Sequence, residues 1–327
     1  MSLRQQRLLR ALARRLPVFS SYERRLAESA QTIAEMAEEL TDCRESRRLW
    51  VPVGHYYSPF VDVAAVQTDR ERIFGGDATV VPAVDLRLDE QRALMAELHE
   101  FAVSFEFSAT EAEAKENGRR YWADNPSFGD SDARFLTAML RHFRPQRLIE
   151  LGCGYSSAVT LDARDRYLDH ELELTFLDPY PELLQSLVRE ADRSTVSILP
   201  IGTQDVDLDL IRQLRENDVL FIDSTHVSKS GSDVNRIFFE ILPALRPGVL
   251  IHLHDIFPNF EYPLEWVLEQ RAWTEQYLLR AFLQFNASFE IVMWPVLLWA
   301  LDPSAFAAHY PNMNANAGSG FWMRKVA

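Results

Sequence analysis

Residues 148–157 read LIELGCGYSS, and this stretch decides the fold. Apolar residues lead into an acid, then a Gly-x-Gly turn, then two serines. This pattern is typical of a buried strand, a tight turn and the N-terminus of a helix, which bring backbone N–H groups close to a nucleotide or similar ligand. Gly152 and Gly154 leave room for that approach because they carry no Cβ. The glycine pattern does not indicate which ligand binds, so the ligand has to be inferred from the surrounding sequence.

Strands and helices alternate along the rest of the chain, in the order that builds a parallel sheet. We expect strands at 147–151, 172–177, 195–200, 218–222, 249–253, 289–294 and 320–326. A helix is expected before them at 132–143, and helices between them at 155–166, from Pro181 onward, and at 207–216, 232–245 and 263–285. Right-handed crossovers between such units predict a doubly wound α/β sheet with helices on both faces.

Composition excludes several classes of protein. The chain has 327 residues and a net charge of −14, which argues against a general nucleic-acid binder because nothing would offset repulsion from phosphates. It has 2 cysteines, too few for a disulfide framework, so we expect a cytoplasmic protein. No apolar run reaches the roughly 18 residues of a membrane span, and the N-terminus lacks the pattern of a signal peptide.

Three regions are expected. Residues 1–50 should form helices for packing or for homo-oligomerisation, because the helix at 22–48 carries a short apolar seam made of Leu26, Ala30, Ile33, Ala37 and Leu40. Residues 51–129 should be a loop-rich and helical cap or lid. They include two aromatic and polar stretches, 54–59 (GHYYSP) and 121–128 (YWADNPSF), which suit either binding loops or packing straps. Residues 130–327 should form the ligand-binding domain.

Polar side chains follow nearly every expected strand. In chain order they are Glu150, Asp178, Gln204, Asp205, Asp223, His226, His254 and Asp255. Ligands of open parallel sheets bind at the carboxyl ends of the strands. Each acid alone could cap the following helix, but an unpaired buried charge is costly. The set therefore favours a ligand site.

Asp178 narrows the choice of ligand. An acid at the tip of the second strand can accept both hydrogen bonds of a ribose diol. A dinucleotide fingerprint would have a glycine where this chain has Ser157, and Glu150 would disfavour a pyrophosphate. A ring of acids suits a positively charged cofactor better.

These residues carry a resemblance to a known family. The stretch ELGCGYSS (150–157) resembles the first motif of class I S-adenosylmethionine-dependent methyltransferases. The stretches FLDPY (176–180), VLFIDSTH (219–226) and PGVLIHLHDIF (247–257) are similar to a bacterial subgroup met beside glycan or natural-product gene clusters, the Methyltransferase-24-like type. The resemblance implies the strand order 3-2-1-4-5-7-6 with an antiparallel strand 7, and it covers residues 130–327.

The resemblance also implies roles for single residues. Glu150 would lie near the cofactor's ammonium, Asp178 would hold the ribose hydroxyls, and Asp223 would face both cofactor and acceptor. The residues implied to contact S-adenosylmethionine are Glu150, Gly152, Gly154, Tyr155, Ser156, Asp178, Gln204, Asp205 and Asp223.

His254 and Asp255 stand where some O-methyltransferases of this fold carry two oxygen ligands of Mg²⁺. An imidazole in the first position weakens a hard, all-oxygen site. Asp223, His254 and Asp255, with His226 as a further donor, could still bind Mn²⁺, Fe²⁺ or Zn²⁺. His254 could instead be the general base that takes the proton of an acceptor hydroxyl, or a buried histidine with a structural role. Asp223, His254 and Asp255 are the expected catalytic residues.

The expected activity is thus methylation, by S-adenosylmethionine, of a small-molecule or sugar acceptor at oxygen. Two alternatives remain at this point: an NAD- or metal-dependent oxidoreductase on the same fold, and a non-catalytic scaffold that keeps the methyltransferase fold. The absence of an evident Lys/Tyr catalytic pair weighs against a nicotinamide enzyme. The retained glycines and acids weigh against a scaffold.

Overall fold

The computed structural model describes residues 25, 29–34, 36, 49–104, 106–313 and 317–327. The chain forms two compact units, Met1–Phe60 and Val61–Ala327. Residues 1–24, at the start of the region expected to form helices, lie outside the described residues. Of the helix expected at 22–48, residues 25, 29–34 and 36 are described, and they are helical.

The second unit is built around a seven-stranded sheet with the strand order β3-β2-β1-β4-β5-β7-β6. The strands are β1 Arg147–Leu151, β2 Glu173–Leu177, β3 Val196–Leu199, β4 Val219–Ile222, β5 Leu250–Leu253, β6 Phe289–Met293 and β7 Phe321–Lys325. Strands β1 to β5 pair in parallel, whereas β7 runs antiparallel to both β5 and β6. The predicted fold class and strand order are therefore confirmed.

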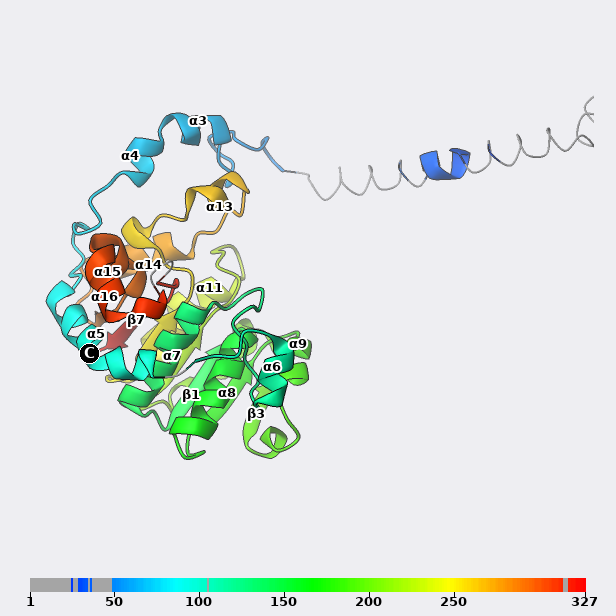
Figure 1. The fold of residues 1–327 in the computed structure, drawn as a ribbon. Coiled ribbons are helices and arrows are strands. Elements are labelled where there is room, and N and C mark those ends of the chain that lie inside the picture. Colours follow the sequence, from blue (N-terminus) through cyan, green and yellow to red (C-terminus); the bar gives the residue numbers. More distant parts are fainter. Residues whose placement is uncertain (1–24, 26–28, 35, 37–48, 105, 314–316) are drawn as a thin grey trace, which may run out of the picture. The chain divides into compact units, whose positions relative to one another are not determined.

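Helices surround this sheet, and α7 and α8 lie side by side against it (Figure 1). The α-helices are α3 Val63–Thr68, α4 Arg70–Phe74, α5 Leu88–Val103, α6 Glu111–Glu116, α7 Asp130–Phe143, α8 Tyr155–Tyr167, α9 Glu182–Leu187, α10 Leu208–Ile211, α11 Asp233–Arg236, α12 Leu242–Ala244, α13 Leu264–Leu268, α14 Glu275–Leu283, α15 Pro295–Leu301 and α16 Pro303–His309. The single-turn 3₁₀ helices are η1 Asp192–Ser194, η2 Thr203–Asp205, η4 Pro258–Phe260 and η5 Pro311–Met313, and η3 Ile237–Ile241 is a π-helical turn between α11 and α12. Among the described residues, no helix is long and apolar enough to cross a membrane.

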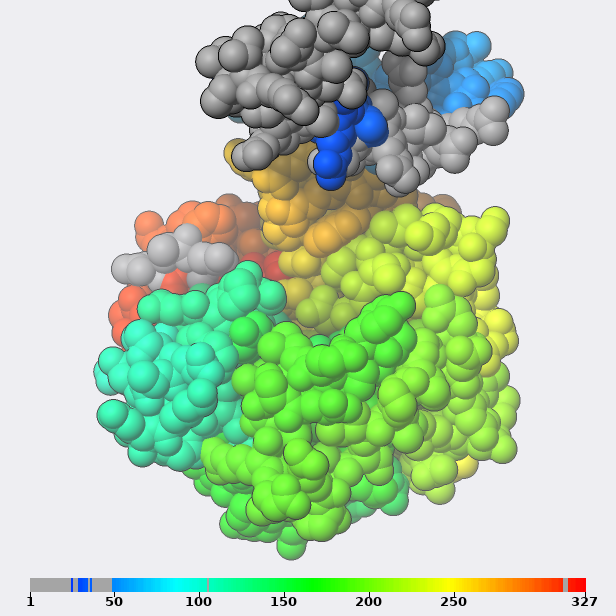
Figure 2. All heavy atoms as spheres, turned by 90° about the vertical axis from the view of Figure 1, so that its right-hand side faces the viewer, coloured from blue at the N-terminus to red at the C-terminus, as the bar shows by residue number. Residues whose placement is uncertain are grey.

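The expectation of one helix over 263–285 is wrong. The structure has α13 and α14 with a break between them, in which Gln270 and Ala272 adopt positive φ angles of 63° and 51°. The break lets the chain turn back toward the loop after β4. In Figure 2 this gold segment adjoins the yellow-green surface of that loop region. Apolar spacing alone could not reveal the break, because both halves keep helical periodicity.

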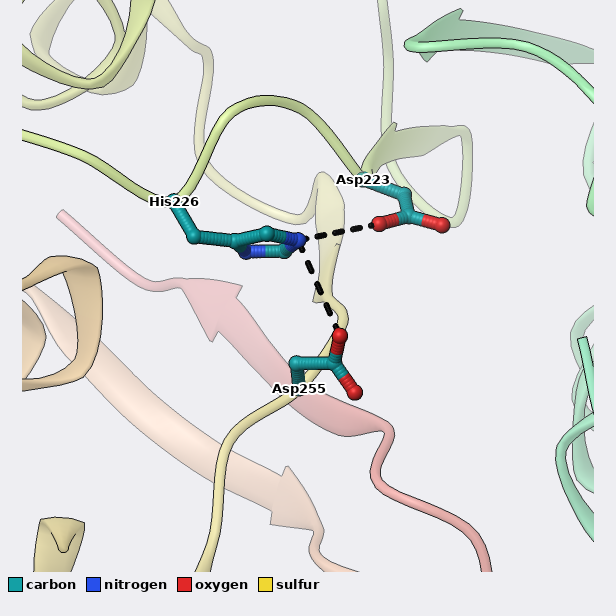
Figure 3. A group of neighbouring side chains, drawn as sticks. All are labelled: Asp223, His226 and Asp255. Carbon is teal, nitrogen blue, oxygen red and sulfur yellow. Dashed lines mark ion pairs between the residues drawn. The ribbon is translucent and has the colours of Figure 1, made fainter. Parts of the chain in front are cut away.

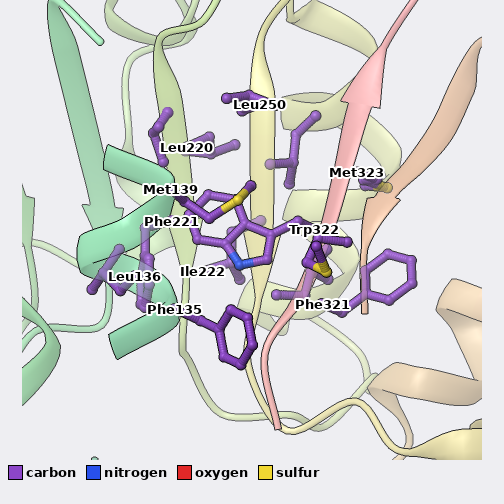
Figure 4. Packing of buried hydrophobic residues seen from close by; sticks show 14 of the residues in the cluster. Phe135, Leu136, Met139, Leu220, Phe221, Ile222, Leu250, Phe321, Trp322 and Met323 are labelled. Carbon is purple, nitrogen blue, oxygen red and sulfur yellow. The ribbon is translucent and has the colours of Figure 1, made fainter. Parts of the chain in front are cut away.

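The core between α7 and the sheet is apolar and tightly filled. Figure 4 shows Phe135, Leu136 and Met139 of α7 facing Phe221 of β4 and Trp322 of β7. All five are at most 3% exposed. Burial of such side chains contributes roughly 1.5–3 kcal/mol each. This rigid layer holds β4 and β5, whose ends carry the polar residues considered next.

The backbone register places the polar residues at one edge of the sheet. Gly152 N donates to Leu177 O, Asp223 N to Leu151 O, and His254 N to Ile222 O, at 2.9–3.0 Å. Gly152, Asp223 and His254 thus each come one residue after the last paired position of their strand. The carboxyl ends of β1, β4 and β5 therefore meet, as the sequence predicted.

Candidate active site

The glycine turn is shaped by close packing of strand ends. Gly152 has φ +85°, and a Cβ built there would lie 1.7 Å from the carbonyl oxygen of Asp223. No side chain fits, so this glycine is needed for the β1 and β4 ends to approach each other. Cys153 N donates to Asp178 Oδ2 at 3.0 Å, and Gly154 N donates to Ser157 Oγ at 3.1 Å. The turn is therefore held by side chains from β2 and α8.

Glu150 is fully buried beneath this turn. Its Oε1 accepts a hydrogen bond from Ser156 Oγ, and its Oε2 has no partner among the described residues. Burial raises the pKa of Glu150 to about 8, against a smaller lowering by the two serines Ser156 and Ser157. An unsatisfied buried oxygen costs free energy. Its retention at a strand end is consistent with a cationic or water-bridged ligand there.

Asp178 follows β2 and anchors two loops at once. Its Oδ2 accepts from Cys153 N, and its Oδ1 accepts from Tyr180 N at 2.7 Å. Each carboxylate oxygen can accept a further hydrogen bond. The side chain is therefore held in place with acceptor capacity left for a diol.

Gln204 and Asp205 lie on η2, after β3, and both are exposed. Gln204 Nε2 donates to the carbonyl of Gly231 at 3.3 Å, which ties η2 to the loop before α11. Their predicted contact with the adenine stays a prediction. Tyr155, at the start of α8, packs edge-on against Trp122 with ring centroids 5.0 Å apart.

Asp223, His226 and Asp255 converge at the ends of β4 and β5 (Figure 3). His226 Nε2 lies 3.3 Å from Asp223 Oδ1 and 3.7 Å from Asp255 Oδ2. One ligand atom from each residue lies within 4.8 Å of the others, a spacing that a single metal ion could bridge. His226 and Asp255 both have positive φ, 59° and 57°. Non-glycine residues rarely adopt this conformation, and where they do it often marks a functional site.

A second layer fixes His226. Its Nδ1 lies 2.8 Å from Oε2 of the buried Glu275, and the ring of Trp273 packs on it at a centroid distance of 4.4 Å. Burial alone would lower the pKa of His226, but Asp223 and Glu275 raise it to about 10.

His254 lies beside this cluster, in a different environment. Its Nε2 is 3.3 Å from Ser319 Oγ and 3.8 Å from Asp255 Oδ1, while its buried Nδ1 has no partner among the described residues. Ser319 Oγ donates to Asp255 Oδ1 at 2.8 Å, and Asp132 Oδ1 accepts from Ser319 N at 2.8 Å. Burial lowers the pKa of His254, but the three neighbouring carboxylates outweigh it and raise the pKa.

Sequence reasoning missed four residues of this site: Asp132, Trp273, Glu275 and Ser319. Asp132 stood in an expected helix start, and Glu275 lay inside what was expected to be one continuous helix. Ser319 directly precedes the last strand, where no pattern singled it out. They belong to the site because the fold brings α7, α14 and the start of β7 next to the ends of β4 and β5.

Part of the chain is similar to known proteins. Residues 149–256 match a family described as "Methyltransferase domain". This match agrees with the resemblance to methyltransferases that the sequence motifs carry. An uncharacterised protein of Archaeoglobus fulgidus is 28% identical over 170 residues, which span 51% of this chain and 74% of that protein.

Two solved structures are similar to the chain at low sequence identity. The SAH-bound methyltransferase PaMTH1 of Podospora anserina is 14% identical, covers 77% of this chain and 99% of its own, and gives a TM-score of 0.41. The O-methyltransferase TomG of Streptomyces achromogenes, in complex with SAM, is 15% identical over 73% of this chain and 99% of its own, with a TM-score of 0.39. Likenesses this distant say nothing about the acceptor or the chemistry of this chain.

Proposed function

We propose that this domain transfers a methyl group from S-adenosylmethionine to a hydroxyl oxygen of a small-molecule or sugar acceptor. The observation that carries the cofactor assignment is that Glu150 and Asp178 both lie at the glycine turn. Glu150 has a buried oxygen without a partner, and Asp178 is held by two backbone N–H groups with acceptor capacity left. An acceptor-rich site of this kind suits a ribose diol and a positive charge.

The cofactor would supply a methyl group already activated by a sulfonium. The chain's own residues then have to align the acceptor and exclude water. His254 is proposed to accept the hydroxyl proton as the new O–C bond forms and the S–C bond breaks, which leaves S-adenosylhomocysteine. Ser319 would steady the ring, since its Oγ lies 3.3 Å from His254 Nε2. General base catalysis of this kind contributes about 10²–10⁴-fold.

A divalent cation also fits the site. Of the two histidines, His226 is the better nitrogen donor, because its Nε2 lies between Asp223 and Asp255. We propose Asp223, Asp255 and His226 as donors, with His254 left as the base. Such an ion would supply Lewis acidity toward the acceptor oxygen.

Calorimetry with S-adenosylhomocysteine tests the cofactor assignment. We expect binding by the wild-type chain and, for Asp178→Ala, a loss of one to two decades in affinity, because a hydrogen bond to a charged group is worth about 1.5–3 kcal/mol. Asp209→Ala is the comparison variant, because Asp209 is exposed on α10 and takes part in none of the proposed cofactor contacts. NAD titrated in parallel should give no heat. Equal affinity of wild type and Asp178→Ala would refute the ribose assignment, and binding of NAD alone would refute the methyltransferase proposal.

A further inference from the structure

The segment between α13 and α14 is hydrogen-bonded to the loop after β4. The carbonyl of His226 accepts hydrogen bonds from both Thr274 N, at 2.9 Å, and Glu275 N, at 3.1 Å. Thr274 Oγ1 accepts from Ser228 N at 2.8 Å. Three hydrogen bonds thus join stretches of chain some 46–49 positions apart. They hold His226 in its uncommon backbone conformation.

The side chains of the same segment fix the imidazole ring. Glu275 is fully buried, and its Oε2 meets His226 Nδ1 at 2.8 Å. Trp273 covers one face of the ring. With Nδ1 committed to Glu275, only Nε2 is directed at Asp223 and Asp255. A partner on one ring nitrogen determines which nitrogen is presented as donor.

We infer that Glu275 is a positioning residue for the cation site. It keeps the proton on His226 Nδ1, so that Nε2 supplies the electron pair between the two aspartates. This inference rests on the proposed function, which places a divalent cation at Asp223, His226 and Asp255. A set of two carboxylates and one imidazole favours borderline cations such as Mn²⁺, Co²⁺ and Zn²⁺ over Mg²⁺.

Cobalt titration of the full chain tests the inference without any acceptor. Binding of Co²⁺ is followed by its visible absorption and by calorimetry, in the wild type and in Glu275→Gln. Glutamine keeps the size of the side chain and can still accept from Nδ1, but it lacks the charge that holds the proton there. We expect Glu275→Gln to weaken Co²⁺ binding about 10–100-fold, the usual effect of losing an outer partner of a metal-bound histidine.

A matched control comes from the same part of the chain. Glu261 Oε2 accepts from Tyr277 Oη at 3.0 Å, and Glu261 forms no hydrogen bond or ion pair with His226. Glu261→Gln should leave the Co²⁺ affinity within about twofold of the wild type. A purely structural role for Glu275 would lower the unfolding midpoint and leave the cobalt spectrum unchanged, so both are recorded for each variant.

A double-mutant cycle with His226→Ala completes the test. If Glu275 acts through His226, Glu275→Gln should have no further effect on Co²⁺ affinity in the His226→Ala background. The inference is overturned by equal Co²⁺ affinity in the wild type and Glu275→Gln, by the same loss in both backgrounds, or by a wild type that binds no Co²⁺. Binding of S-adenosylhomocysteine is measured separately, so failure of the cofactor assignment is distinguished from failure of the Glu275 role.

Discussion

At the scale of single residues, Glu150 shows what burial does to a carboxyl group at a strand end. Below about pH 8 and without a bound cation the folded chain holds its carboxyl mostly neutral, because burial raises the pKa from the ordinary 4.5 to about 8. The unfolded chain has no such burial, so its carboxyl ionises at the ordinary pKa. A neutral carboxyl can still accept from Ser156 and can donate from its other oxygen to a ligand or a water molecule.

The raised pKa predicts that Glu150→Gln becomes more stable relative to the wild type as the pH rises. The folded pKa lies above the unfolded one, so the stability linked to the neutral carboxyl is complete below about pH 4.5 and is lost as the pH rises through about 8. Glutamine does not titrate. The variant should therefore gain on the wild type by ~2 kcal/mol in unfolding free energy between pH 6 and pH 8, given 1.36 kcal/mol per pKa unit. Urea unfolding at both values checks it, and a difference that does not change with pH would contradict the prediction.

At the scale of elements, a buried ionic cluster fastens the segment before α7 to the sheet region. The side chain of Arg120 is 2% exposed and donates to Asp162, Asp165 and Asp192 at 2.5–2.8 Å. These acids lie on α8 and η1. Burial opposes the charge of Arg120, but the three carboxylates outweigh it and raise its pKa. The cluster thus fixes one end of the aromatic stretch 121–128.

Removal of Arg120 should leave three acids without their shared partner. We expect Arg120→Met, which keeps the apolar stem, to lower the unfolding free energy by roughly 3 kcal/mol, since breaking a buried ion pair costs about 3–5 kcal/mol. Arg212→Met is the matched control, because Arg212 pairs with Asp209 on the surface at 2.7 Å. That change should cost less than about 1 kcal/mol. Similar losses in the two variants, measured by urea unfolding, would show that the cluster is not a stabilising anchor.

Elements also show where sequence reasoning succeeds. The positions of the strands follow from apolar runs bounded by turn residues, whereas their order was implied by the family resemblance. The acids at the strand ends then come together because the parallel register carries them to one edge of the sheet. The break at 269–274 was not predictable in this way. It depends on hydrogen bonds to His226, which is distant in sequence, so the roles suggested for Glu275 and Trp273 had no local signal.

At the scale of the whole molecule, the residues proposed to bind the cofactor, the cation and the acceptor hydroxyl all lie in the unit Val61–Ala327. Its buried apolar core also lies within that unit, with Val81 as the first member of the main cluster along the chain. In the other unit, Ile33 of the expected apolar seam is 67% exposed. An exposed apolar position on a helix is available to a second copy of the chain.

A chain that begins at Val61 should therefore fold and keep its cofactor site. We expect its affinity for S-adenosylhomocysteine to stay within about twofold of the full chain, because every proposed contact is retained. If the helical seam joins copies of the chain, light scattering should show a smaller assembly for the truncated chain. An unchanged assembly would contradict the oligomerisation role of residues 1–50 and leave the packing role. A loss of acceptor turnover with intact cofactor binding would instead assign a role in acceptor binding to residues 1–60, which include the stretch 54–59. Weakened cofactor binding in a folded truncated chain would show that the second unit alone does not make the site.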